Sequence, residues 1–74
     1  MATVIREFTP DVIREIREVL KLSQKDFAIR YGLGPASVAR WENDYFKPSR
    51  HTLPHLIRAA EEAGFEVELK EEVA

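Results

Sequence analysis

The chain contains no cysteine, which excludes a disulfide framework and thiolate metal sites. It also lacks any apolar run near the roughly 18 residues that a membrane-spanning helix needs. The opening sequence, MATVIREFTP, includes the charged Arg6 and Glu7 and lacks the apolar core of a signal peptide. We therefore expect a cytoplasmic protein without a membrane partner.

Positive charge is not in excess over the whole chain, because the formal net charge is −2. Between Arg14 and Arg58, however, nine Lys and Arg stand against five Asp and Glu, a balance of +4. From Glu61 onward, six Glu stand against Lys70 alone, a balance of −5. Attraction to phosphate depends on the local surface and not on the total charge. The central segment therefore permits binding to nucleic acid without requiring it.

The length of the chain limits its organisation. With 74 residues there is room for one core, and we expect residues 1–74 to form a single domain. A domain of this size buries only about 60% of the surface that its unfolded chain exposes, which leaves no second layer for a deep active-site cleft. The hydrophobic share of 45% is typical of a globular protein and not of a disordered one.

Apolar residues at helical spacing begin after a capping motif at Thr9-Pro10, because threonine can cap a helix and proline suits its first turn. We expect a helix over about residues 10–21. The apolar positions of this helix are Val12, Ile13, Ile16, Val19 and Leu20. Before it, the segment ATVIREF is rich in β-branched and aromatic residues and predicts a short extended stretch.

Two shorter helices follow, joined by a glycine-containing turn. The first starts at Ser23, where Ser-Gln-Lys-Asp has the form of a capping box, and ends at Gly32. The second starts at Gly34-Pro35 and runs to about Asn43. Two short helices of this kind, the second opening with small and polar residues, are the pattern of a helix-turn-helix.

A fourth helix is expected between a cap at Thr52 and a stop at Gly64. After it, Phe65–Leu69 alternates strictly between apolar and acidic side chains, which predicts a half-buried strand. Two partners are possible for this strand. One is the N-terminal extended segment, which would complete the monomer's own core, and the other is the same strand of a second protomer.

The sequence LSQKDFAIRYGLGPASVARWENDYFKP, residues 22–48, resembles the Cro/lambda-repressor-like family, also called the XRE family, without a gap. The matching positions are Leu22, Ser23, Gln24, Phe27, Ala28, Gly32, Leu33, Gly34, Val38, Trp41, Glu42 and Pro48. The resemblance covers about residues 13–63. It implies an all-α bundle of four helices, with a helix-turn-helix at about 23–43 and short extended or β segments at both ends.

Two positions depart from the family pattern. The family usually has a glycine two residues after the glutamate, where this chain has Asp44. Aspartate tolerates the left-handed geometry that ends a helix there. The family's common fifth helix, often a dimer contact, is replaced by the Phe65–Leu69 segment, which leaves the dimer geometry and the spacing of operator half-sites open.

The resemblance implies a transcriptional regulator that reads the major groove of double-stranded DNA with the helix at about 35–43. Val38 and Trp41 on this helix turn toward the core. The outward residues are the base-reading candidates Ala36, Ser37 and Arg40. An arginine can bond O6 and N7 of guanine together, an alanine can contact a thymine methyl, and a serine can donate to a base or a phosphate.

The expected contacts to the DNA backbone are Gln24, Asn43, Lys47 and Arg50. Gln24 follows the Ser23 cap, where the free N–H groups of a helix N-terminus can meet a phosphate. The other three lie at the end of the reading helix or just beyond it, and such contacts position a domain without reading sequence. By the same resemblance, Arg17 and Glu42 form a buried ion pair that is structural.

We expect a homodimer on a partly palindromic operator, because one reading helix buries little DNA surface and two-fold operators match two-fold proteins. Repression is the outcome that the resemblance favours. The alternative is an antitoxin-type protein-interaction module, which neutralises a toxin partner and autoregulates its operon. Small antitoxin regulators share the short length and the VARWE sequence of the reading helix. Contacts to a toxin would lie at Tyr45, Phe46, the surface of the fourth helix or the acidic tail Glu66–Glu72.

His51 and His55 are four residues apart, which raises the possibility of a metal site. However, His51 precedes the expected cap at Thr52, and no carboxylate completes the spacing of a zinc-protease motif. A phosphate contact is the functional use that we favour for either histidine. We therefore expect no metal, no cofactor, no catalytic residue and no enzymatic activity.

Overall fold

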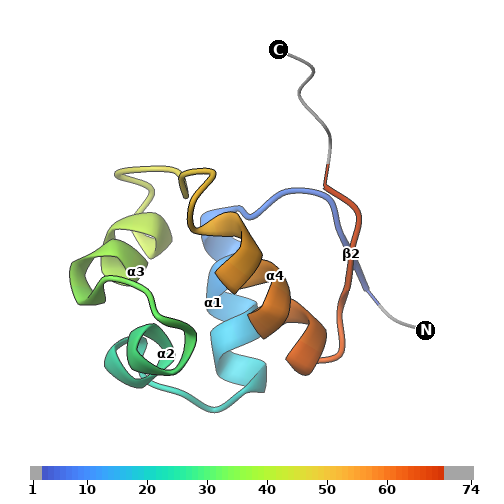
Figure 1. The fold of residues 1–74 in the computed structure, drawn as a ribbon, viewed down its shortest axis with the longest axis horizontal. Coiled ribbons are helices and arrows are strands. Elements are labelled where there is room, and N and C mark those ends of the chain that lie inside the picture. The colour runs from blue at the N-terminus through green and yellow to red at the C-terminus, as the bar shows by residue number, and fades with distance from the viewer. Residues whose placement is uncertain (1–2, 70–74) are drawn as a thin grey trace.

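The computed structural model describes residues 3–69, in which four helices and two short strands are present (Figure 1). In chain order these are β1 (Val4–Ile5), α1 (Pro10–Val19), α2 (Gln24–Tyr31), α3 (Pro35–Glu42), α4 (Leu53–Glu62) and β2 (Glu66–Val67). The expected all-α bundle of four helices with short extended segments at both ends is confirmed. Within residues 3–69, no helix combines the length and the apolar character needed to cross a bilayer.

Two of the helix starts are capped as expected. The hydroxyls of Thr9 and Ser23 each accept a hydrogen bond from the amide three residues further on, at 3.2 and 3.0 Å. Thr52 precedes α4 as expected, but its side chain does not cap that helix. Its hydroxyl instead donates to the Ser49 carbonyl at 2.7 Å, which closes the loop before the helix.

The helices end at residues in the left-handed conformation. α1 ends at Val19, before the expected Lys21, because Lys21 itself has a φ of 59°. The N–H of Leu22 then reaches back to a carbonyl in the last turn of α1 at 3.1 Å, which satisfies that helix end. Asp44 has a φ of 61° after α3, which confirms that aspartate supports the turn usually made by glycine. The expected glycine stops are confirmed at Gly32 and Gly64.

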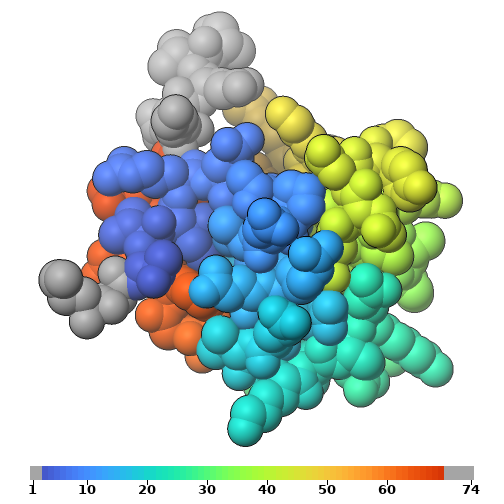
Figure 2. Space-filling view, turned by 180° about the vertical axis from the view of Figure 1, so that it is seen from behind, coloured from blue at the N-terminus to red at the C-terminus, as the bar shows by residue number. Residues whose placement is uncertain are grey.

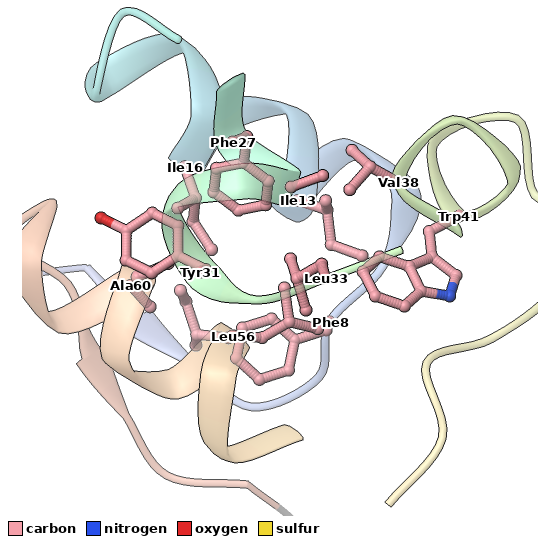
Figure 3. Close-up of a cluster of buried hydrophobic side chains, with 13 residues drawn as sticks. Phe8, Ile13, Ile16, Phe27, Tyr31, Leu33, Val38, Trp41, Leu56 and Ala60 are labelled. Carbon is pink, nitrogen blue, oxygen red and sulfur yellow. The ribbon is translucent and has the colours of Figure 1, made fainter. Parts of the chain in front are cut away.

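The core lies where the four helices meet, and its labelled side chains point toward one another in Figure 3. Ile13 of α1, Phe27 of α2, Val38 of α3 and Leu56 of α4 are each 0% exposed. Trp41 is 5% exposed, in agreement with its predicted place in the core. Burying one such side chain stabilises the fold by about 1.5–3 kcal/mol. The two buried apolar residues of α3, Val38 and Trp41, therefore fix the rotation of that helix against the rest of the molecule.

β1 and β2 pair with each other in parallel, at the side of the molecule away from α3 (Figure 1). The Glu66 N–H donates to the Thr3 carbonyl at 2.9 Å, and the Glu68 N–H donates to the Ile5 carbonyl at 2.8 Å. Of the two partners left open by the sequence, β2 therefore pairs with the N-terminal segment of its own chain. The strand is shorter than the expected 65–69, but the alternation holds, with its glutamates exposed and its apolar residues half-buried.

Figure 2 shows the same separation from behind. The yellow-green atoms of α3 and the loop after it form one side of the molecule. The blue N-terminal segment and the orange β2 form the other side. The surface of α3 is therefore remote from the pair of strands.

Replacing Lys21 with glycine is expected to raise the free energy of unfolding. A side chain in the left-handed conformation costs about 1–2 kcal/mol, and the extra freedom of glycine in the unfolded chain costs about 0.5–1 kcal/mol. The net gain should be about 0.5–1 kcal/mol in urea unfolding. Lys21→Ala is the matched control, because it removes the same charge and keeps the Cβ. Equal stability of the two variants would contradict this account of the end of α1.

Candidate nucleic-acid interface

The third helix, α3, has a buried face and an exposed face at the edge of the molecule (Figure 1). Ala36 and Arg40 are exposed and Ser37 is half-buried. Positions 36 and 40, like 37 and 40, are neighbours on a helix surface, so the structure brings the three predicted base-reading residues together. A Cβ at Gly34 would lie 2.9 Å from the Ser37 Oγ, which shows that glycine leaves room for this serine at the start of the helix.

A buried ion pair joins α1 to the C-terminal end of α3. The Arg17 Nε donates to the Glu42 Oε2 at 2.7 Å and its Nη2 donates to the Oε1 at 3.0 Å, so two parallel hydrogen bonds connect the groups. The Glu42 side chain is 3% exposed and the Arg17 side chain 18%. Arg17 Nη1 also donates to the Leu22 carbonyl at 3.0 Å. The structure thus brings together the two residues that the family resemblance placed in an ion pair.

Two further side chains contact Glu42. The Gln24 Nε2 donates to the Oε1 at 3.3 Å, and the Arg14 Nε lies 3.6 Å from the same oxygen. Arg14 Nη2 also donates to the backbone carbonyl of Glu42 at 3.0 Å. One carboxylate therefore connects α1, the first residue of α2 and the last turn of α3.

The charges around Glu42 govern its protonation. Burial raises the pKa of this carboxyl, but hydrogen bonds from Arg17 and Gln24 and the charges of Arg17 and Arg14 outweigh burial and hold the pKa below its ordinary value. The same hydrogen bond favours the charged form of Arg17 and so raises the pKa of that guanidinium. A carboxyl with a lowered pKa stabilises the fold above its ordinary pKa, and this contribution is lost as the pH falls through the lowered value.

The predicted phosphate contacts lie in two places. Gln24 is the first residue of α2 and is half-buried beside Glu42. One of the two side-chain amide hydrogens of Gln24 is donated to the Glu42 carboxylate. Asn43, Lys47 and Arg50 are exposed in the segment that follows α3. The Asn43 Nδ2 donates to a carbonyl of α3 at 2.9 Å, so this amide is held against the end of the helix.

The sequence of this region agrees with a known family. A family model described as helix-turn-helix matches residues 13–61, which include all of α2 and α3. The chain belongs to the helix-turn-helix family. It is of the Cro/lambda-repressor type, the XRE family, as the resemblance implied. The sequence matches none of the curated proteins compared with it.

This helix-turn-helix protein is a DNA-binding transcriptional regulator. The two helices of the helix-turn-helix motif are α2 and α3. The turn between them contains Gly32, which has a φ of 68°, and Leu33, which is 7% exposed. The left-handed glycine ends α2, and the buried leucine fastens the turn to the core. The family is one of regulators that are generally not enzymes.

The two histidines lie apart from any cluster of metal-binding groups. His51 is exposed before α4, and His55 is half-buried, with its ring 3.9 Å from where a Cβ of Gly32 would lie. In the part of the chain that the structure describes, no three side chains of His, Cys, Asp or Glu gather where they could hold a metal ion.

Sequence reasoning missed several contacts of the helix-turn-helix. Arg14 was not assigned to Glu42, although it lies one helical turn before Arg17 and so on the same side of α1. The hydroxyl of Tyr31 donates to Glu62 at 2.7 Å, which ties α2 to α4. Burial and this bond raise the pKa of Tyr31. A bond between residues so far apart in sequence leaves no local pattern by which to find it.

Replacing Glu42 with glutamine is expected to lower the free energy of unfolding at pH 7 by about 3 kcal/mol. This value is at the low end of the cost of breaking a buried ion pair, about 3–5 kcal/mol, because Arg17 keeps some contact with water. The variant should also lose less stability than the wild type below about pH 4.5, since the lowered pKa of Glu42 no longer contributes.

Urea unfolding at a series of pH values measures both effects. Glu18→Gln is the matched control, because Glu18 is an exposed carboxylate on the same helix as Arg17. If the Glu42 variant kept both the stability and the acid profile of the Glu18 variant, the carboxylate would not hold these helices together.

Proposed function

We propose that this protein is a sequence-specific repressor of transcription that reads the major groove of double-stranded DNA with α3. The division of α3 into two faces carries the proposal. Its inner face is held in the core, and its other face, which carries the exposed Ala36 and Arg40, belongs to a helix at the edge of the molecule (Figure 1). The major groove of B-DNA, about 12 Å wide, admits an α-helix. A helix that is fixed on one face can enter this groove as a rigid unit.

Each outward side chain suits a different contact to the base edges. The paired N–H donors of Arg40 match O6 and N7 of guanine, which is the commonest specific contact in the major groove. The methyl group of Ala36 suits the methyl group of thymine, and the hydroxyl of Ser37 can donate to a base or a phosphate. Because a good bidentate contact contributes about 1–3 kcal/mol of discrimination, Arg40 supplies most of the sequence preference.

Four polar side chains hold the DNA backbone in this proposal: Gln24, Asn43, Lys47 and Arg50. Gln24 is at the N-terminus of α2, where free N–H groups and the helix dipole favour a phosphate. One of its amide hydrogens bonds Glu42, and the other is available to a phosphate oxygen. Lys47 and Arg50 are exposed cations beyond α3. These contacts fix the register of the protein on the duplex.

A homodimer on a partly palindromic operator completes the proposal. One helix-turn-helix buries too little DNA surface for tight specific binding, and two-fold operators match proteins with two-fold symmetry. This dimer does not depend on an exchange of C-terminal strands, because β2 already pairs with β1 of its own chain.

A second candidate function is that of an antitoxin that neutralises a toxin protein and regulates its own operon. Tyr45 and Phe46 favour it, because they are 74% and 62% exposed and aromatic residues are enriched in protein interfaces. Both residues follow α3 between the proposed phosphate contacts Asn43 and Lys47, so a toxin bound there would compete with the duplex.

Selection of bound fragments from random duplex DNA tests the proposal, with the mass of the complex measured in the same buffer. A dimeric repressor should enrich one motif in two inverted copies, and its complex should contain two chains for each duplex. Enrichment of no motif in dilute salt, where phosphate contacts are strongest, would reject sequence-specific DNA binding. The protein-interaction function would then remain.

Arg40→Ala is expected to lower discrimination between the selected operator and a duplex with the contacted guanine replaced. The loss should be about tenfold, because it removes a bidentate contact of about 1–3 kcal/mol. Competition binding measures this ratio, and thermal unfolding checks that the exposed change leaves the fold intact. Arg6→Ala removes an equal charge near β1 and should leave the ratio unchanged. An unchanged preference in the Arg40 variant would show that this residue reads no base.

Lys47→Ala is expected to weaken binding to all duplexes about equally. It should also reduce the slope of the logarithm of affinity against the logarithm of salt concentration by roughly one, since one phosphate contact is lost. Titrations of operator and unrelated duplexes at several salt concentrations measure both quantities. A loss confined to the operator would mean that Lys47 contacts a base and not a phosphate.

A further inference from the structure

The turn after α3 places an aromatic ring against the arginine that is proposed to read a base. The Arg40 Cζ lies 5.8 Å from the centroid of the Phe46 ring, within the range of a cation–π contact. The positive φ of Asp44 reverses the chain at this point, and the Tyr45 N–H donates to the Arg40 carbonyl at 2.9 Å. The turn therefore brings position 46 back alongside position 40.

The contact with the ring leaves the hydrogen-bond donors of Arg40 available. Among residues 3–69, Arg40 takes part in no ion pair and its side chain donates no hydrogen bond. A cation–π contact uses none of the hydrogen bonds that a guanidinium can donate to a polar acceptor, and a guanine edge needs those donors. A carboxylate at the place of Phe46 would occupy them instead.

We propose that Phe46 is a positioning residue that presents Arg40 to the DNA and thereby helps to determine base specificity. The inference rests on the proposed function, in which Arg40 reads a base. A free arginine side chain loses rotamer freedom when it binds, and a ring that restricts the side chain beforehand reduces that loss. Phe46 therefore increases discrimination without contacting a base itself.

Phe46 lies next to the fixed part of the molecule. It lines a shallow groove of about 200 Å³ together with Phe8, Trp41 and Pro48. Phe8 and Trp41 are 7% and 5% exposed and belong to the core. The neighbouring Tyr45 does not line this groove, which makes it a matched control for the loss of an exposed aromatic ring.

Phe46→Leu is the test variant, because leucine keeps an apolar side chain and removes the aromatic face. Phe46→Tyr keeps the face, and Tyr45→Leu removes the adjacent ring. The quantity measured is the ratio of dissociation constants for the selected operator and for the duplex with the base contacted by Arg40 replaced. Phe46→Leu should lower the discrimination about two- to fivefold, the size of an exposed cation–π contact. The two control variants should leave it unchanged.

The effect of Phe46 must depend on Arg40. In an Arg40→Ala background, Phe46→Leu should change the discrimination no further. If Arg40→Ala lowers discrimination and Phe46→Leu does not, the role of Phe46 is overturned and the proposed function stands. If Phe46→Leu weakens both duplexes equally, its role is only structural, which also overturns the inference. If Arg40→Ala itself leaves discrimination unchanged, base reading by Arg40 fails and the role of Phe46 fails with it.

A measurement without DNA tests the contact directly. In the free protein, the Cδ protons of Arg40, which are next to the guanidinium that lies over the Phe46 ring, should resonate upfield of their usual NMR position. The shift should disappear in Phe46→Leu and persist in Tyr45→Leu. Unshifted protons in the wild type would overturn the positioning role, whatever the binding data showed.

Discussion

Glu42 carries a negative charge inside a small protein, and three helices are arranged around that charge. A carboxylate that is 3% exposed is costly unless cations and hydrogen-bond donors surround it. Arg17 of α1 supplies two donors, Gln24 at the start of α2 supplies a third, and Arg14 adds a second positive charge. Because removing any of these leaves the charge less well compensated, the helices are held in one arrangement relative to one another.

This arrangement has a direct consequence for DNA binding. Gln24 lies at the end of α2 that is proposed to meet a phosphate, and Glu42 lies in the last turn of the helix that is proposed to read bases. The hydrogen bond between them therefore helps to fix the distance between the proposed backbone contact and the proposed base contacts. The buried residues Val38 and Trp41 fix the rotation of α3, which leaves Arg40 exposed beside the turn that carries the Phe46 ring.

Most helix boundaries could be predicted from the sequence because their causes are local. The cap at Thr9 and the stop at Gly32 act within one turn of the chain, and both are present in the structure. The end of α1 was placed too late, since a left-handed Lys21 is recognised only from the backbone. The family resemblance paired Arg17 with Glu42, and it placed the proposed base-reading residues on one helix. A family motif gives residue types at positions along the chain, however, and does not show which other side chains lie next to them in three dimensions. The contacts of Arg14 and Phe46, and the choice of β1 as the partner of β2, therefore required the structure.

The most direct test of this account is to follow the backbone amide resonances of the protein while the selected duplex is added. The account predicts the largest changes along the exposed face of α3, at the first turn of α2 and in residues 43–50, with β1 and β2 unaffected on the far side of the molecule. Changes concentrated on the two strands, or no changes at all in dilute salt, would contradict it.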